Sequence, residues 1–255
     1  MSEAAVLVQV EDTIATLTLN RPEHRNAINR DMAELLRDHL RELSSSEDLR
    51  LLILRGAGED FSVGRDREAY ERQLELSPWE QRRVFQGIIL TNRLLYEFPA
   101  PTLAVAQGRI EGAGAGLTLN CDMVVAAENA TLRLPEIDAG IPPAIIIAKL
   151  PRLMPTRKAF ELVALGCPIS ATEAMEYGLV NRVFPPGQLD DGVEGLKRDF
   201  LDKTRVSLRL IKQSFREMAD LGYEQALRHA VPTLASTITH EEIREATANA
   251  LKRKG

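Results

Sequence analysis

The hydrophobic residues near the start of the chain alternate with polar residues or run in short blocks, a pattern typical of strands. Residues 6–10 and 14–19 lie on either side of the polar pair Glu11 and Asp12, which predicts two strands joined by a tight turn. Residues 49–55, with the sequence LRLLILR, predict a third and strongly apolar strand. The beginning of the chain therefore predicts part of a sheet.

Between the second and third strands the hydrophobic period changes to that of a helix. From about Arg30 to Leu43 the apolar residues recur every three or four positions, as on the buried face of an amphipathic helix. Asn26 or Asn29 can accept hydrogen bonds from its first turn as the N-cap. A strand, a helix and a second strand in this order predict two parallel strands joined by a crossover.

The middle of the chain combines one charged segment with several helices. Residues 59–78 are rich in charge and weakly patterned, which fits a solvated loop or short helix and also fits a mobile wall of a pocket. Residues 78–97 predict a long amphipathic helix. A shorter helix is expected over residues 170–177, where Ser170 and Glu173 have the spacing of a capping box.

A proline-rich segment at residues 185–187 divides the chain into two predicted parts. Residues 1–186 predict an α/β core. Residues 187–255 predict a helical C-terminal region, with breaks near Gly222 and Pro232.

The composition mainly excludes classes of function. The 255 residues carry 32 Lys and Arg against 37 Asp and Glu, a net charge of −5 that argues against a nucleic-acid-binding surface. The start of the sequence lacks the pattern of a secretory signal, and no apolar run approaches the roughly 20 residues of a membrane span, so we expect a cytoplasmic protein without a membrane partner. Cys121 and Cys167 lie in apolar surroundings and are predicted to be buried thiols. The four histidines are too scattered in the sequence to predict a metal site.

The most distinctive stretch of the chain is residues 101–143. An apolar run at 102–106 predicts a buried strand, and a helix over about 113–121 and a strand at 123–127 follow. Glycines that let backbone approach a ligand closely accompany them, namely Gly108, Gly112, Gly114 and Gly116. Unpaired N–H groups at a helix start stabilise an anionic oxygen, and a carboxylate beside an apolar pocket, such as Glu136, can move a proton. The stretch therefore predicts a site where an oxyanion forms, although tight strand–helix packing without a ligand also explains the glycines.

Several short motifs around this stretch occur together in one protein family. In chain order they are Asn20-Arg21-Pro22, Asn26-Ala27-Ile28, Phe61-Ser62-Val63-Gly64-Arg65-Asp66, Cys121-Asp122, Pro135-Glu136 and Gly178-Leu179-Val180. With these motifs the chain resembles the crotonase superfamily, the enoyl-CoA hydratase/isomerase proteins, over nearly its whole length. The resemblance implies an α/β fold, a crotonase-type spiral of ββα units with a helical C-terminal region. It also implies an acyl-CoA substrate with no cofactor beyond that coenzyme A, and a homotrimer or dimer of trimers with the C-terminal helices at subunit contacts.

The resemblance also implies roles for single residues. The backbone N–H groups of Arg65 and Ala113 would hold the thioester oxygen, although the family usually has small residues at both positions and glycine at the second. Glu136 matches the family's acid/base glutamate. Substrate and CoA would lie against backbone at Arg25, Ala27, Val63, Gly64 and Gly112. The Arg65 guanidinium could reach a CoA phosphate or Asp66, narrow the pocket, or form a plain surface salt bridge.

One departure from the family pattern leaves the reaction open. Gly116 stands where typical hydratases have another glutamate, which helps to hold the water that adds to the double bond. One carboxylate suffices to move a proton between two carbons, as in the Δ3,Δ2-enoyl-CoA isomerases, and hydroxycinnamoyl-CoA hydratase-lyases also have a single glutamate. Glu111 or Asp138 could supply a second carboxylate, with a solvated or structural role as the alternative for each. We therefore expect isomerisation or hydration of an enoyl-CoA, carbon–carbon cleavage, or acyl-CoA binding with weak catalysis.

Overall fold

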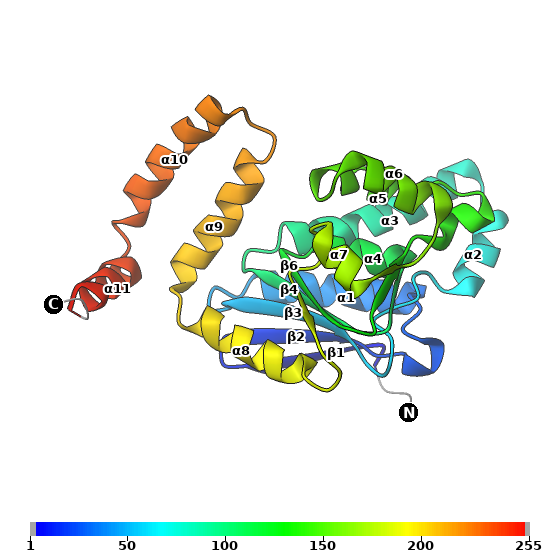
Figure 1. Cartoon of the computed structure of the whole chain (residues 1–255), viewed down its shortest axis with the longest axis horizontal. Helices are drawn as coiled ribbons and strands as arrows, with labels where there is room; N and C mark the ends of the chain where they lie inside the picture. Colours follow the sequence, from blue (N-terminus) through cyan, green and yellow to red (C-terminus); the bar gives the residue numbers. More distant parts are fainter. Residues whose placement is uncertain (1–3, 253–255) are drawn as a thin grey trace.

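The computed structural model describes residues 4–252, so residues 1–3 and 253–255, at the ends of the two predicted parts, lie outside the described range. A six-stranded sheet forms its centre (Figure 1). The first two strands pair antiparallel, and every later strand runs parallel to its neighbour, which confirms the predicted hairpin and crossover. The order across the sheet is β1 (Val6–Glu11), β2 (Ile14–Leu19), β3 (Leu51–Gly56), β4 (Thr102–Ala106), β6 (Met123–Ala127) and β9 (Arg182–Phe184).

A second, three-stranded sheet pairs the short strands that follow β4 and β6, so that successive strand–strand–helix units wind as a spiral. Its strands are β5 (Arg109–Glu111), β7 (Thr131–Arg133) and β8 (Ile169–Ser170). β5 follows β4 and β7 follows β6, and these two short strands pair in parallel. Strands β4 and β5 lead into helix α4 (Gly112–Leu119), and strands β6 and β7 lead into the 3-10 helix η2 (Pro135–Ala139). This repetition of two strands and a helix gives the predicted α/β architecture and places the ends of both units side by side.

Helices bury both faces of the large sheet. In β3, Leu52 and Leu54 belong to one hydrophobic core, whereas Leu51 and Ile53 belong to another, as the alternation of a strand requires. The first core packs against α1 (Arg30–Ser44), α3 (Pro78–Tyr96) and α4. The second core packs against α8 (Leu189–Leu201), whose buried residues are Leu189, Val193 and Leu196.

The other elements before residue 187 are short. They are η1 (Pro22–His24), α2 (Arg67–Leu74), α5 (Ala144–Ile147), η3 (Leu150–Arg152), α6 (Thr156–Leu165) and α7 (Ala171–Glu176). Two predicted caps are confirmed. The side chain of Asn29 accepts a hydrogen bond from the N–H of Met32 at the start of α1, and Ser170 and Glu173 form the capping box of α7. Among residues 4–252, no helix is both long and apolar enough to cross a membrane.

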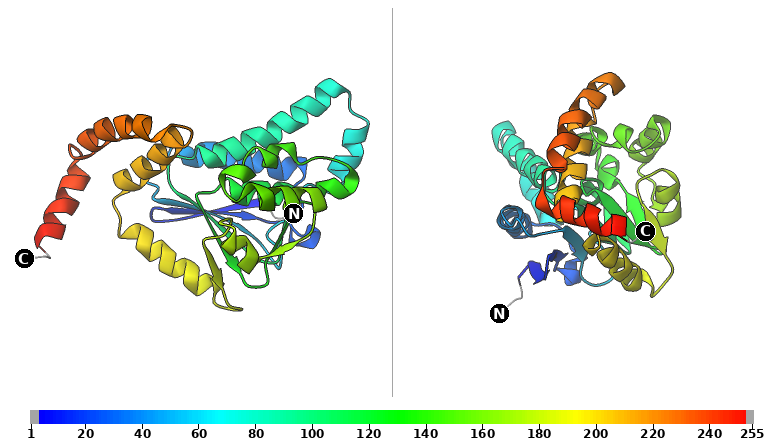
Figure 2. Two further views of the ribbon diagram at one scale, coloured as in Figure 1. Left: turned by 45° about the horizontal axis from the view of Figure 1, so that its top comes forward. Right: turned by 90° about the vertical axis from the view of Figure 1, so that its left-hand side faces the viewer.

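Three further helices extend away from the core as an arm (Figures 1 and 2). Gly222 is the N-cap of the middle one, which confirms the predicted break there. The predicted break near Pro232 is wrong, because Pro232 lies inside that helix. The helix buries none of its residues, so water can satisfy the carbonyl that Pro232 leaves without an N–H partner. The arm consists of α9 (Arg205–Met218), α10 (Tyr223–Thr237) and α11 (Glu241–Lys252).

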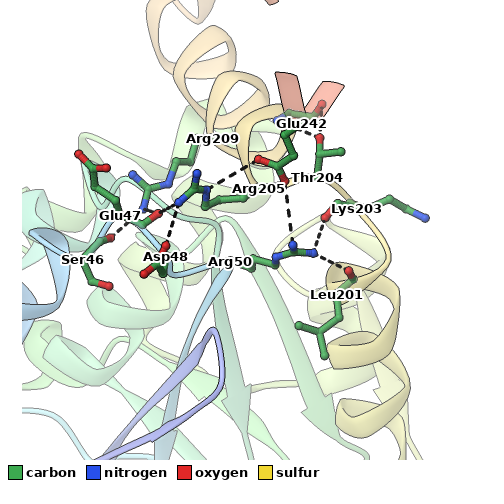
Figure 3. A network of polar contacts seen from close by, with 11 residues as sticks. Ser46, Glu47, Asp48, Arg50, Leu201, Lys203, Thr204, Arg205, Arg209 and Glu242 are labelled. Carbon is green, nitrogen blue, oxygen red and sulfur yellow. Dashed lines mark hydrogen bonds and ion pairs between the residues drawn. The ribbon is translucent and has the colours of Figure 1, made fainter. Parts of the chain in front are cut away.

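A polar network ties the base of the arm to the turn that precedes β3 (Figure 3). Arg209 donates to the carbonyls of Ser46 and Glu47 at 2.8 and 2.9 Å. Arg205 donates to the same Glu47 carbonyl at 2.8 Å and pairs with Asp48 at 3.0 Å. The start of α9 is therefore held by both side-chain charge and backbone carbonyls.

Further along α9, one lysine enters the core. Lys212 is only 5% exposed, and its Nζ lies 2.7 Å from Oδ2 of Asp122. The same ammonium donates to the carbonyl of Ala100 at 3.1 Å. Burial lowers the pKa of Lys212, whereas the Asp122 carboxylate opposes that change. The lysine therefore holds α9 against residues just before β4 and β6.

The two cysteines differ in their surroundings. Cys121 is partly buried against the main core, so its prediction as a buried thiol is only partly met, and burial raises the pKa of its thiol to about 12. Cys167 is exposed, so its prediction as a buried thiol is wrong. It follows Gly166, the C-cap of α6, and lies in the loop that leaves this helix.

Candidate active site

Two loops meet at the start of helix α4. The N–H of Ser62 donates to the carbonyl of Arg109 at 3.0 Å, and the N–H of Glu111 donates to the carbonyl of Ser62 at 2.9 Å. A Cβ on Gly64 would lie 3.0 Å from the Glu111 carbonyl oxygen and 3.3 Å from the Ala113 nitrogen. Gly64 also has φ +85°, a conformation that residues with side chains rarely adopt. Glycine is therefore required here because the two backbones touch.

The contact brings two unpaired backbone N–H groups close together. Within residues 4–252, neither Arg65 N–H nor Ala113 N–H donates a hydrogen bond. Ala113 belongs to the first turn of α4, where amides have no acceptor inside the helix and the helix dipole is positive. Such an arrangement can stabilise an oxygen that gains negative charge during a reaction.

A buried polar network fixes the loop that carries Arg65. Asn26 is fully buried, and its amide donates to two carbonyls of the turn at residues 57–60, each at 2.8 Å. Arg21 pairs with Asp66 at 2.8 Å across the same loop. The two asparagine-containing motifs near the N-terminus therefore hold the loop in its position beside α4.

The residues predicted to contact CoA lie along these loops. The N–H of Val63 donates to the carbonyl of Arg25 at 3.1 Å, and the carbonyl of Ala27 accepts a hydrogen bond from Arg21 at 2.6 Å. The Arg25 side chain is more than half exposed, with its Nε 3.9 Å from Oδ2 of Asp60. The structure brings these residues together near the start of α4, and their contact with CoA stays a prediction.

Glu136 lies directly over the start of α4. Its Oε1 is 2.9 Å from the position that a Cβ would take on Gly112, which has φ +48°. Its Oε2 is buried and has no hydrogen-bond partner in the described part of the chain. Burial raises the pKa of Glu136, the charge of Glu111 adds to the rise, and the charge of Arg65 opposes it. The predicted proton carrier and both predicted oxyanion donors therefore lie in one place.

The Arg65 side chain lies against α2. Its guanidinium lies 4.5 Å from the ring centroid of Tyr70 and donates to the side chain of Gln73. It does not pair with Asp66, whose carboxylate binds Arg21 instead. Burial lowers the pKa of Arg65, and burial followed by the charge of Glu136 raises the pKa of Tyr70. Among the predicted alternatives, pairing with Asp66 is therefore wrong, whereas reach to a CoA phosphate and narrowing of a pocket stay predictions.

The two candidates for a second carboxylate have different neighbours. Asp138 pairs with Arg133, and its side chain is about half exposed at 53%. Glu111 is partly buried and its charge acts on Glu136, but its side chain forms no hydrogen bond or ion pair within residues 4–252. The three atoms nearest to a Cβ at Gly116, within the described chain, belong to Asn92 and Ile146 and not to a carboxylate.

Asn92 is a residue that the sequence alone did not single out. It is only 9% exposed and lies on α3, with its amide toward Gly116. The only sequence signal would have been a polar residue on the apolar side of an amphipathic helix. That signal does not say which element the side chain faces.

A metal centre and two surface hollows were the other candidate sites in the described part of the chain. Residues 4–252 contain no group of three or more His, Cys, Asp or Glu that could hold a metal ion. One surface hollow lies at the base of the arm, beside Arg205 and Glu242, and a second lies beside Gln9 and Arg55. Neither hollow includes Glu136.

Comparison with known proteins assigns the family. A sequence model described as Enoyl-CoA hydratase/isomerase matches residues 9–254. The chain belongs to this family. The enoyl-CoA hydratase/isomerase assignment confirms the resemblance found in the sequence motifs and, because the match spans nearly all residues, it applies to both the core and the arm.

Individual members of the enoyl-CoA hydratase/isomerase family agree in sequence and fold. The hydroxycinnamoyl-CoA hydratase-lyase of Pseudomonas fluorescens is 33% identical over 227 residues, which cover 86% of this chain and 81% of that protein. The crotonyl-CoA hydratase of Syntrophomonas wolfei is 29% identical over 229 residues, covering 89% and 87%. The crystal structure of an enoyl-CoA hydratase from Mycobacterium smegmatis superposes with a TM-score of 0.94 at 28% identity, covering 98% of this chain and 97% of that one. The crotonase fold is thereby confirmed.

Proposed function

We propose that this enzyme acts on an acyl-CoA thioester through an enolate. In this proposal the N–H groups of Arg65 and Ala113 hold the thioester oxygen, and Glu136 moves the proton. The observation that carries it is the partly buried Glu136 carboxylate, whose buried Oε2 has no partner within residues 4–252 and whose Oε1 lies 2.9 Å from the Cβ position of Gly112, at the start of α4. A carboxylate is rarely left in this state unless something else meets it.

The chemistry follows from where charge develops. Removing a proton beside a thioester carbonyl, or adding a nucleophile across a conjugated double bond, puts negative charge on the thioester oxygen. A preorganised N–H donor stabilises that charge by roughly 3–4 kcal/mol in the transition state. The raised pKa of Glu136 supports its role, since a proton carrier works best with a pKa near the operating pH.

The type of reaction depends on what else the site can hold. Glu136 alone suffices to move a proton between two carbons, which supports double-bond isomerisation. Hydration uses the same enolate and needs a further polar group to hold water. The names of the related hydratases support hydration, and the relative from Pseudomonas fluorescens makes a hydratase-lyase a further candidate.

A paired turnover assay separates these reactions. Esters of CoA with 2-enoyl and 3-enoyl chains, from crotonyl upward, are followed by the absorbance of the conjugated thioester. A rise with the 3-enoyl ester indicates isomerisation, and a loss with the 2-enoyl ester indicates hydration. Glu136→Gln lowers either rate by about 10²–10⁴-fold if Glu136 is the proton carrier. Binding of the esters without turnover would instead support a weakly catalytic acyl-CoA binder.

We further propose that the arm forms subunit contacts in a trimer or dimer of trimers. Its helices expose large apolar side chains that a monomer would leave in water, including Phe215 at 77%, Tyr223 at 75% and Val231 at 68%. The arm also projects away from the core, as the views in Figure 2 agree in showing. Sedimentation or light scattering gives the mass, and Phe215→Glu is expected to shift it toward the monomer.

A further inference from the structure

The side chain of Asn92 is a nearly buried amide without a partner in the described part of the chain. It is 9% exposed, and no donor or acceptor within residues 4–252 forms a hydrogen bond with its side chain. Its neighbour Thr91 differs, because the Thr91 hydroxyl donates to the Gly87 carbonyl at 3.1 Å. The amide atoms of Asn92 are not fully buried, unlike Oε2 of Glu136, which also lacks a partner. A group from outside the chain, such as water, can therefore reach the Asn92 amide and form hydrogen bonds with it.

The amide faces a position kept open by a glycine. A Cβ on Gly116 would lie 3.6 Å from Nδ2 and 3.8 Å from Oδ1 of Asn92, and 3.9 Å from Ile146. Both ends of the amide thus face the same place, so it can donate to a ligand or accept from one. The distances are those of ordinary contact, so packing does not demand glycine at 116 as it does at 64.

This position lies four residues along α4 from the one that Glu136 meets. A Cβ on Gly112 would contact the Glu136 carboxylate, and a Cβ on Gly116 would contact the Asn92 amide. Positions four apart lie on the same side of a helix, so these two side chains, each with a polar atom that has no partner within residues 4–252, border the start of α4.

We propose that Asn92 positions the water that adds to an enoyl-CoA at this site. The proposal rests on the proposed function and selects hydration within it. Asn92 is a positioning residue, and Glu136 carries the proton.

The step balances with one carboxylate. Water held between Asn92 and Glu136 forms a bond from its oxygen to C3 of the 2-enoyl thioester and gives one proton to Glu136. The electron pair of the C2–C3 double bond moves to the thioester oxygen, at the N–H groups of Arg65 and Ala113. The enolate then takes the proton from Glu136 at C2. The sum is the addition of H and OH across the double bond, with the carboxylate restored.

The test compares two reactions of the same site. Hydration of crotonyl-CoA is measured by the loss of its conjugated absorbance. Exchange of the α-protons of butyryl-CoA with deuterium from the solvent is measured by mass spectrometry, and it needs the enolate and Glu136 but no added water. For Asn92→Leu we expect the ratio of hydration to exchange to fall about tenfold or more, a factor on the order of one hydrogen bond. Its melting temperature should not fall, because an unmet amide is replaced by an apolar group of similar size.

Two further variants make the comparison specific. Gly116→Ala places a methyl group in the proposed water position, and should lower the same ratio without lowering the melting temperature, since alanine favours the helix. Thr91→Val makes a polar-to-apolar change on the same helix away from Gly116, and should leave the ratio within about twofold, as for a change outside the network.

The outcomes separate this proposal from the proposed function. An unchanged ratio in Asn92→Leu, or equal loss of both reactions with a lower melting temperature, would overturn the role of Asn92. Exchange that depends on Glu136 in a wild-type protein that hydrates no 2-enoyl ester would also overturn it, while leaving the enolate chemistry intact. Absence of both reactions in the wild type would overturn the proposed function and this inference with it.

Discussion

Replacing Gly64 with alanine tests whether the contact between the two loops matters for catalysis. The new Cβ would lie 3.0 Å from the Glu111 carbonyl oxygen and 3.3 Å from the Ala113 nitrogen, so one of the two backbones has to move by a few tenths of an ångström. The positive φ of Gly64 adds about 1–2 kcal/mol of strain in a residue with a side chain. Moving one N–H out of place would cost roughly 2.7–4 kcal/mol of transition-state stabilisation, or about 10²–10³-fold in kcat.

Gly187→Ala is the matched control for this variant. Gly187 has a similar φ of +75°, and a Cβ there would meet no atom within 4 Å. Both variants should lose similar stability through strain in urea unfolding, with Gly64→Ala losing somewhat more. Only Gly64→Ala should lose turnover of the enoyl-CoA ester, and α-proton exchange should fall with it. Equal kcat in the two variants would show that the geometry at Gly64 does not set the position of the N–H groups.

Three other predictions follow from burial and packing. Glu136→Gln should unfold at a higher temperature than the wild type at pH 8, where the wild-type carboxylate is charged in a site that raises its pKa. The difference in melting temperature should shrink as pH falls through the raised pKa, because the folded wild type then gains a proton on Glu136, and a pH series of melting curves measures this. Gly195→Ala should stabilise α8 by about 0.5–1 kcal/mol, since its Cβ would meet nothing within 4 Å. Gly192→Ala on the same helix should destabilise the protein, because its Cβ would overlap the ring of Phe184 in β9. Chemical denaturation compares the free energies of unfolding of the two variants. Lys212→Met should cost somewhat less than the roughly 3–5 kcal/mol of a fully buried broken pair, because the side chain of Asp122 is 33% exposed, and faster proteolysis within α9 should accompany the loss.

Local patterns were sufficient to predict most of the fold. The apolar blocks that became β3 and β4 are buried on both faces, β2 is buried mainly on one face, and the caps at Asn29 and Ser170 use side-chain groups close in sequence to their partners. The error at Pro232 arose because proline breaks helices on average, whereas this exposed helix can let water satisfy the freed carbonyl. The error at Cys167 arose because apolar neighbours in sequence do not determine how a loop leaves a helix.

The site required contacts between distant segments. Glu136, Arg65 and Ala113 could be named from motifs because each occurs in a recognisable run of residues. The position of Asn92 over Gly116 depends on how α3 packs on α4, and no short-range pattern encodes that packing. The contact of Arg65 with Tyr70 joins residues only five apart, but it depends on where the loop before α2 places the guanidinium, which the charged and weakly patterned sequence there does not determine.

The two free N–H groups at the start of α4 belong to the main chain, and this has a consequence for the evolution of the protein. A substitution at residue 65 changes the group that faces Tyr70 and Gln73 but, unless it introduces proline, leaves the N–H in place. Under the proposed function, selection can therefore change the side chain at residue 65 without rebuilding the element that would stabilise charge. An arginine at this position shows how large a change in side chain the backbone arrangement tolerates.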